Sequence, residues 1–152
     1  MSNPVIRRLE AADKLQWRQL WLAYCDFYQA TVSEPVTEAT WQRVLAPEGA
    51  MGCFVAEDTA SRKLLGFVQY VIHPRTWSVE DVCYLEDLFV DPDARGLKLG
   101  YRLCEAIRQL AKERGLSQVY WNTQEHNHAA RKLYDRIGKK DDFIRYVMPI
   151  RV

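Results

Sequence analysis

The sequence lacks a strong charge excess of either sign. Its 152 residues include 21 basic and 20 acidic residues, a formal net charge of +1. Proteins that bind nucleic acids or membrane surfaces usually carry a basic excess, so this composition argues against both kinds of partner. No apolar run approaches the ~20 residues that span a bilayer, and the first ten residues, MSNPVIRRLE, lack the apolar block of a secretory signal. We therefore expect a cytoplasmic protein.

Paired cysteines and clustered metal ligands are also missing. The cysteines show no C-x-x-C spacing and each lies in an apolar segment, which predicts reduced, buried thiols at Cys25, Cys53, Cys83 and Cys104. His73 stands alone, and the two-residue spacing of His126 and His128 would point them apart on a helix. The sequence therefore predicts no metal site.

The length and the hydrophobic periodicity predict one domain, residues 1–152, that contains both strands and helices. No repeat, linker or low-complexity segment divides the chain. One face of the first helix carries Trp17, Trp21, Tyr24 and Tyr28, and Thr37 is the candidate cap of the second. Strands are predicted at 5–10, 52–58, 63–73, 82–90, 117–123 and 143–152, and helices at 11–30, 33–45, 97–114 and 125–138.

This order of elements predicts a mixed α/β sheet with helices on both faces. The strands in the middle of the chain are expected to be antiparallel. The helix at 97–114 should connect the strands before and after it as a right-handed crossover, which makes those two strands parallel. Ligands of such sheets bind beyond the carboxyl ends of the strands.

The segment that follows the strand at 82–90, DPDARGLKLG, is typical of a phosphate-binding loop. Gly96 and Gly100 allow the backbone to approach a ligand closely. The helix that begins here directs its unpaired N–H groups and the positive end of its dipole toward an anion. Arg95 adds a fixed positive charge that can form two parallel hydrogen bonds to phosphate.

Two longer segments, YLEDLFVDPDARGLKLGYRL and VYWNTQEHNHAARKLYDRIG, resemble the GNAT superfamily of acyl-CoA-dependent N-acyltransferases. Arg95 and Gly100 fit the family motif Arg/Gln-x-x-Gly-x-Gly/Ala, although Lys98 replaces its middle glycine. The second motif, Asn-x-x-Ala-x-x-x-Tyr, is intact from Asn127 to Tyr134. The resemblance implies acetyl-CoA as co-substrate, a homodimer, and a mostly antiparallel sheet of six to seven strands flanked by about four helices.

The resemblance also implies a set of residues that bind acetyl-CoA. The strand backbone near Leu88–Val90 would pair with the pantetheine arm, with Phe89 and Val90 as amide donors, and Asn127 would hydrogen-bond the arm. The complete implied set is Leu88, Phe89, Val90, Arg95, Gly96, Leu97, Lys98, Leu99, Gly100, Asn127 and Tyr134.

Acetyl transfer to an amine also needs a base and an acid. The resemblance favours Glu86 as the base, acting through a water. Tyr134 is the candidate general acid, because the reference pKa of a phenol, ~10, lies close enough to that of a thiol, ~8.5, for donation to a departing thiolate. Strand alternation places Glu86 and Asp87 on opposite faces of the sheet unless the strand bulges. Two roles for Asp87 therefore stay open, an ammonium anchor or a structural hydrogen-bonding residue. Trp121 lies within reach of an acceptor.

The expected activity is acetyl transfer from acetyl-CoA to a primary amine of a small molecule. The Leu-Glu-Asp triplet of YLEDLFV is similar to that of the diamine/polyamine branch, the spermidine/spermine N-acetyltransferases. Two alternatives stay open. The acceptor could be a protein or peptide amine, or the domain could be a non-catalytic sensor that binds acyl-CoA.

Overall fold

The computed structural model describes residues 3–94 and 96–151, which form two compact units. The first unit ends at Asn122 and contains the sheet, and the second begins at Thr123. The strands are β1 (Pro4–Arg8), β2 (Met51–Asp58), β3 (Leu64–His73), β4 (Val82–Val90) and β5 (Val119–Tyr120). The helices are α1 (Lys14–Phe27), α2 (Glu34–Leu45), α3 (Leu99–Arg114) and, in the second unit, α4 (His128–Ile137). Short 3-10 turns at Ala11–Asp13 and Pro92–Ala94 precede α1 and α3.

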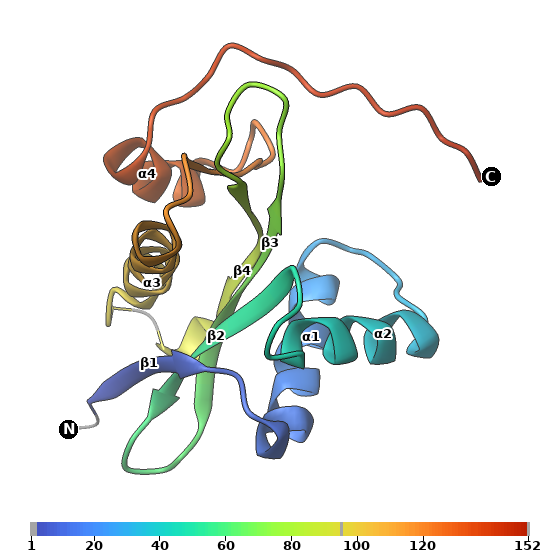
Figure 1. Ribbon diagram of the computed structural model, residues 1–152. Coiled ribbons are helices and arrows are strands. Elements are labelled where there is room, and N and C mark those ends of the chain that lie inside the picture. The colour runs from blue at the N-terminus through green and yellow to red at the C-terminus, as the bar shows by residue number, and fades with distance from the viewer. Residues whose placement is uncertain (1–2, 95, 152) are drawn as a thin grey trace. The chain divides into compact units, whose positions relative to one another are not determined.

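The five strands lie side by side in the order in which they occur in the chain (Figure 1). Strands β1 to β4 pair antiparallel, whereas β5 is parallel to β4. The predicted parallel pair on either side of α3 is therefore confirmed. The predicted class is also confirmed, because the described residues form a mixed α/β fold with four helices and a mostly antiparallel sheet, although that sheet has five strands rather than six or seven.

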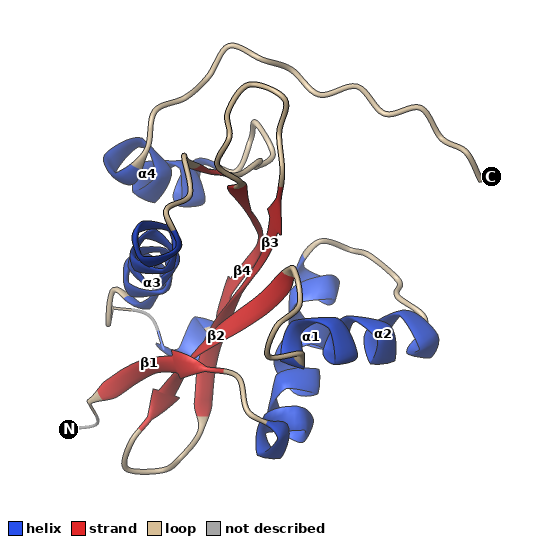
Figure 2. Cartoon of the chain, in the orientation of Figure 1, coloured by secondary structure: helices blue, strands red, loops and turns tan. Residues whose placement is uncertain are grey.

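The predicted final strand is wrong for the described residues 143–151. The backbone after α4 has no strand pairing there, and Figure 2 draws it as loop. Its exposed apolar side chains are those of Phe143, Ile144, Tyr146, Val147, Met148 and Ile150. A strand is stabilised by pairing its backbone with a neighbouring strand, so an apolar pattern alone cannot fix one.

Helices α1 and α2 cover one face of the sheet (Figure 1). They are joined to it by a cluster of buried side chains that includes Trp17, Trp21 and Trp41. Trp17 is only 1% exposed, and its ring stacks on that of Trp21 with centroids 5.7 Å apart. Ring contacts continue from Trp21 to Tyr24 and from Tyr24 to Tyr28. The predicted aromatic face is therefore confirmed for the helix itself, and burial of Trp17 and Trp21 is a major source of core stability. Tyr28 directly follows α1 and is exposed.

Helix α2 begins at Glu34, with Ser33 as its N-cap residue and Pro35 in its first turn. The prediction that Thr37 caps this helix is wrong. Thr37 lies inside the helix, where its buried Oγ1 accepts a hydrogen bond of 3.1 Å from Nε1 of Trp21. Proline favours the first helical turn because it lacks a backbone N–H and its φ is already helical, so Pro35 marked the start better than the threonine did.

Helix α3 packs on the opposite face of the sheet (Figure 1). It begins at Leu99, two residues later than predicted. Gly115 ends it in the left-handed conformation, φ +65°, as predicted. The predicted apolar stripe is confirmed and consists of the buried residues Leu99, Leu103, Ile107 and Leu110.

The four cysteines are free and buried, as predicted. Burial raises the pKa of Cys83 to about 11 and that of Cys104 to about 12. Thiols with such pKa values stay protonated at neutral pH, and the thiolate is the reactive form. These two side chains therefore act as core residues.

Candidate active site

Strand β4 contains a bulge at Glu86. Gln69 of β3 pairs with Asp87, but the next residue, Tyr70, pairs with Leu85, so Glu86 is one extra residue in β4. A regular strand would place Leu85 and Asp87 on the same face. The bulge interrupts that alternation, so Asp87 faces α1, Leu85 faces the other side, and Glu86 is exposed at the bend. The sequence alone did not decide whether this strand contains a bulge, and the structure shows that it does.

The carboxylate of Asp87 lies beneath α1 and accepts two hydrogen bonds. Oδ1 accepts from the hydroxyl of Tyr24 and Oδ2 from Nε2 of Gln69, both at 2.8 Å. Oε1 of Gln69 accepts in turn from Nε1 of Trp17 at 2.7 Å, which fixes the orientation of the amide. Burial raises the pKa of Asp87, while the two hydrogen bonds act in the opposite direction.

This network holds the bulge against α1. Trp17 and Tyr24 are seven residues apart, so their polar tips reach the sheet from one face of the helix. Sequence reasoning missed the roles of Tyr24 and Gln69. The aromatic periodicity predicted that Tyr24 is buried, but periodicity cannot reveal which polar group on a neighbouring strand its hydroxyl meets.

Beyond the bulge, β4 has an open backbone edge. In the described part of the chain, β4 pairs with β5 only at Cys83–Val119 and Tyr84–Tyr120. The N–H of Asp91 donates to the carbonyl of Leu65 on β3. Because antiparallel pairs alternate between bonded and non-bonded positions, the Phe89 amide is also directed to β3. The amides of Leu88 and Val90 are therefore directed to the open edge.

The edge leads into the predicted phosphate loop and the start of α3. Gly96 has φ +88°, which favours glycine, and a Cβ there would meet no atom within 4 Å. No side chain caps α3, and its first helical hydrogen bond runs from the Arg102 N–H to the Lys98 carbonyl. The N–H groups of Leu99 and Gly100 thus lie in the first turn, where a helix offers donors to an anion. Of the other predicted loop residues, Leu97 is 41% exposed. Arg95 lies outside the described residues.

Lys98 adopts the left-handed conformation, with φ 54° and ψ 32°. This conformation costs a residue with a Cβ roughly 1–2 kcal/mol. We expect Lys98→Gly to raise the melting temperature and to keep or improve affinity for acetyl-CoA, measured by thermal unfolding and calorimetric titration. Lys98→Ala separates the two effects, because it keeps the strain and removes the charge. A many-fold weaker affinity in both variants would instead make the ammonium group a phosphate ligand.

The second sequence motif lies in the second unit. Asn127 is the N-cap residue of α4, where its side-chain oxygen accepts a hydrogen bond of 3.4 Å from the N–H of Ala130. Tyr134 lies in the next-to-last turn and is partly buried. Asn127 therefore has a structural role in starting the helix that carries Tyr134. Trp121 belongs to the first unit, where it directly follows β5 and is partly buried.

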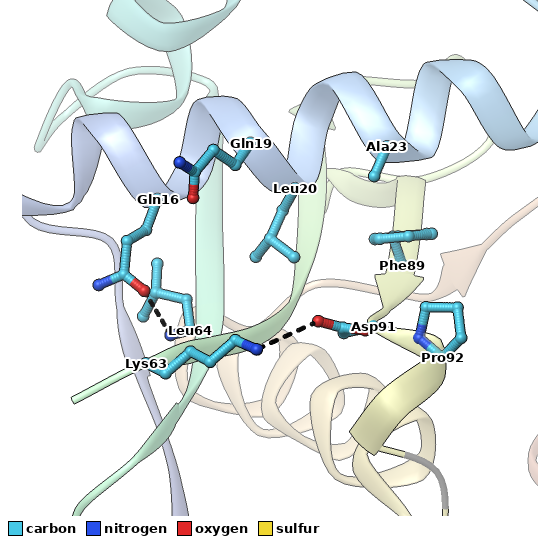
Figure 3. Close-up of a pocket in the computed structure, with 9 residues that line it drawn as sticks. All are labelled: Gln16, Gln19, Leu20, Ala23, Lys63, Leu64, Phe89, Asp91 and Pro92. Atoms are coloured by element: carbon cyan, nitrogen blue, oxygen red, sulfur yellow. Dashed lines mark hydrogen bonds and ion pairs between the residues drawn. The ribbon is translucent and has the colours of Figure 1, made fainter. Parts of the chain in front are cut away.

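A hollow of about 260 Å³ lies between α1 and the end of β4 (Figure 3). A hydrogen bond and an ion pair join polar groups of its lining. Oε1 of Gln16 accepts from the N–H of Leu64 at 2.9 Å, and Nζ of Lys63 lies 3.8 Å from Oδ2 of Asp91. Figure 3 shows both interactions, with Leu20 above them and Phe89 next to Asp91 and Pro92. The lining therefore joins α1 to the hairpin between β2 and β3.

Comparison with known proteins agrees with this geometry. The model of the acetyltransferase (GNAT) family matches residues 17–138. The D-amino-acid N-acetyltransferase HPA3 of Saccharomyces cerevisiae is 33% identical over 142 residues, which cover 93% of this chain and 88% of that protein. The chain belongs to the GNAT family and is an acetyltransferase.

Two further similarities are more limited. The thialysine N-epsilon-acetyltransferase of Bos taurus is 30% identical over 78 residues, 51% of this chain and 45% of that protein. The aminoglycoside N-acetyltransferase AAC(6')-Iy, solved in complex with CoA, has a TM-score of 0.84 at 17% identity and covers 99% of this chain and 97% of its own. At an identity this low, the similarity shows that the two proteins share a fold.

Within residues 3–94 and 96–151, no helix is long and apolar enough to cross a membrane. The same residues contain no group of three or more histidine, cysteine or acidic side chains that could hold a metal ion.

Proposed function

We propose that this acetyltransferase transfers an acetyl group from acetyl-CoA to a primary amine of a small molecule. The bulge in β4 carries the proposal. It exposes a carboxylate, Glu86, next to an open strand edge, and the chain continues from there to the start of α3, which no side chain caps and which we propose binds phosphate. An acyl donor with a phosphate group would extend along this edge, and a cationic acceptor would be attracted to the carboxylate.

The open edge and the start of α3 fit acetyl-CoA. The amides of Leu88 and Val90 are directed to the open edge, where they would bind the pantetheine arm as an added strand. Leu99 and Gly100 offer N–H groups to the pyrophosphate, and Arg95 and Lys98 add positive charge. When bound, acetyl-CoA supplies a thioester as acetyl donor and a thiolate as leaving group. Gly96 and Leu97 shape the loop, and the resemblance adds Asn127. Phe89, which the resemblance implied as an amide donor, does not fit that role, because its amide is directed to β3 and not to the open edge.

The side chains near the bulge would bind the ammonium form of the acceptor and remove its proton. Glu86 attracts the ammonium group and accepts its proton through a water. Asp87 adds a second negative charge, while Tyr24 and Gln69 keep its position fixed. We assign the general acid role to Tyr134, which would protonate the departing thiolate, and a contact with the acceptor to Trp121.

Two acceptor classes are supported to different degrees. The names of the yeast and bovine relatives indicate amino-acid acceptors, a D-amino acid and thialysine, and the yeast relative matches nearly the whole chain. The diamine or polyamine acceptor rests on the Leu-Glu-Asp triplet alone. The names of the relatives therefore favour an amine that belongs to an amino acid.

The test is mass-spectrometric detection of acetyl transfer near pH 8 to a panel of D- and L-amino acids, thialysine, diamines, polyamines and lysine peptides. Acetylation of one small amine would support the proposal and identify the class. Acetylation of peptides alone would make the protein a peptide acetyltransferase. Acetyl-CoA binding without transfer to any amine would favour the sensor.

Glu86→Gln is expected to lower kcat/KM for the acceptor about tenfold. This loss is smaller than the loss on removal of a base that acts directly, because a water can take over part of the role of Glu86. The affinity for acetyl-CoA should stay unchanged, since the amide keeps the shape of the side chain. Glu80→Gln is a matched control, because Glu80 precedes β4 and is exposed. Equal losses in both variants would reduce the role of Glu86 to a general attraction for cations.

A further inference from the structure

Three side chains from three strands meet where β4 and β5 diverge. The rings of Tyr84 and Tyr120 are stacked with centroids 4.9 Å apart, and the ring of His73 meets that of Tyr120 edge-on at 5.7 Å. The hydroxyl of Tyr84 also accepts a hydrogen bond of 3.3 Å from Nδ2 of Asn122. All four residues belong to the first unit.

The contacts of His73 define which of its nitrogens carries a proton. Nδ1 lies 2.8 Å from the carbonyl oxygen of Pro74, and a carbonyl can only accept, so Nδ1 bears the hydrogen. Nε2 lies 2.7 Å from the hydroxyl oxygen of Tyr120. In the neutral imidazole Nε2 is therefore an acceptor, and the Tyr120 hydroxyl donates to it.

This pair lies beside the bulge. Strand alternation places Tyr84 on the sheet face that α1 covers, the same face as Asp87. Tyr84 and Tyr120 form the last paired position before the open edge begins. Burial raises the pKa of Tyr120, and the charges of Tyr84, Cys83 and Glu86 add to the increase.

We propose that Tyr120 and His73 form a proton relay that accepts the proton leaving the acceptor amine. This inference rests on the proposed acetyl transfer and names a second proton acceptor for it. Imidazole suits the task better than a carboxylate, because its reference pKa of about 6.5 lies nearer to the ~10.4 of an ammonium group than the ~4.3 of a glutamate does.

The transfer balances without a further reactant. An N–H bond of the ammonium breaks and its proton passes, directly or through a water, to the oxygen of Tyr120. The phenol O–H bond breaks at the same time, and that proton binds Nε2 of His73. The amine is left neutral and nucleophilic. His73 is partly exposed and returns its proton to solvent, which restores the resting pair.

The experiment compares two acceptors in each variant: the best acceptor from the panel and the same molecule with two fluorines on the carbon next to the amine-bearing carbon. The fluorines lower the pKa of the ammonium, so the analogue needs less help to lose its proton. His73→Gln keeps an acceptor for the Tyr120 hydroxyl but cannot hold a proton, and Tyr120→Phe removes the hydroxyl. Tyr146→Phe is the control, because Tyr146 is 87% exposed after α4.

We expect both variants to lose about tenfold in kcat on the ordinary amine and much less on the fluorinated one, with KM for acetyl-CoA unchanged. Equal losses on the two amines, or no loss in His73→Gln, would overturn the relay while the proposed function stands. A wild-type protein that binds acetyl-CoA but acetylates no amine of the panel would overturn both the relay and the proposed function.

Discussion

Arg7→Ala is expected to lower the free energy of unfolding by about 3 kcal/mol. The guanidinium of Arg7 lies between two buried carboxylates. It donates to both oxygens of Asp13 at 2.8 and 2.9 Å and to those of Glu57 at 3.3 and 3.1 Å. Asp13 is 5% exposed and Glu57 8%. Without Arg7, two negative charges would remain in the core with their main partner removed, and urea unfolding of both proteins measures the difference.

A matched control is Arg18→Ala, which removes an arginine that pairs with Glu34 on the exposed surface of α1 and α2. We expect little change there, because exposed ion pairs are weak. A loss in Arg7→Ala no larger than in Arg18→Ala would contradict the buried network as a source of stability.

The same network predicts how stability depends on pH. Burial raises the pKa of Asp13, but the hydrogen bonds from Arg7 and from the Glu10 N–H, together with the charges of Arg7 and Arg62, outweigh it, so this pKa is lowered in the folded protein. Hydrogen bonds from Arg7 likewise lower the pKa of Glu57. Groups with a lowered folded pKa stabilise the protein above their unfolded value, about 4, and lose that contribution as the pH falls through the folded value. The difference between wild type and Arg7→Ala should therefore shrink below about pH 4.

Tyr134→Phe is expected to lower kcat about 100-fold and to leave affinity for acetyl-CoA largely intact. The substitution removes only the hydroxyl, so the partly buried ring keeps its place in α4. Without a proton donor, the sulfur of CoA must leave as a thiolate, which raises the barrier for the transfer. Steady-state kinetics near pH 8 and equilibrium titration with acetyl-CoA separate the two quantities.

Tyr146→Phe again supplies the control, since it removes a hydroxyl from the same unit at an exposed position. Equal turnover in Tyr134→Phe and wild type would remove Tyr134 from the acid role. A large loss of affinity for acetyl-CoA with unchanged kcat would make it a binding residue.

The periodicity of the sequence predicted where the helices and the strands β1 to β4 of the first unit lie. Strand β5 is shorter than predicted, Val119–Tyr120 rather than 117–123. The aromatic face of α1 and the apolar stripe of α3 repeat at helical spacing, so burial of these faces follows from the pattern. The parallel pair of β4 and β5 followed from the helix between them. The final strand was predicted from an apolar pattern, but pairing needs a neighbouring strand, and sequence spacing does not supply one.

For the candidate site, the sequence by itself determined which residue types are available: the glycines of the phosphate loop, the carboxylates of β4, and the asparagine and tyrosine of the second motif. Only the tertiary structure decided where the strand bulges, because a bulge depends on the register between β3 and β4. It also decided that Asp87 meets Tyr24 and Gln69, and that His73 meets Tyr120, because these contacts join residues 18 to 63 positions apart. A local pattern records the period of its own element, whereas such contacts depend on how several elements pack.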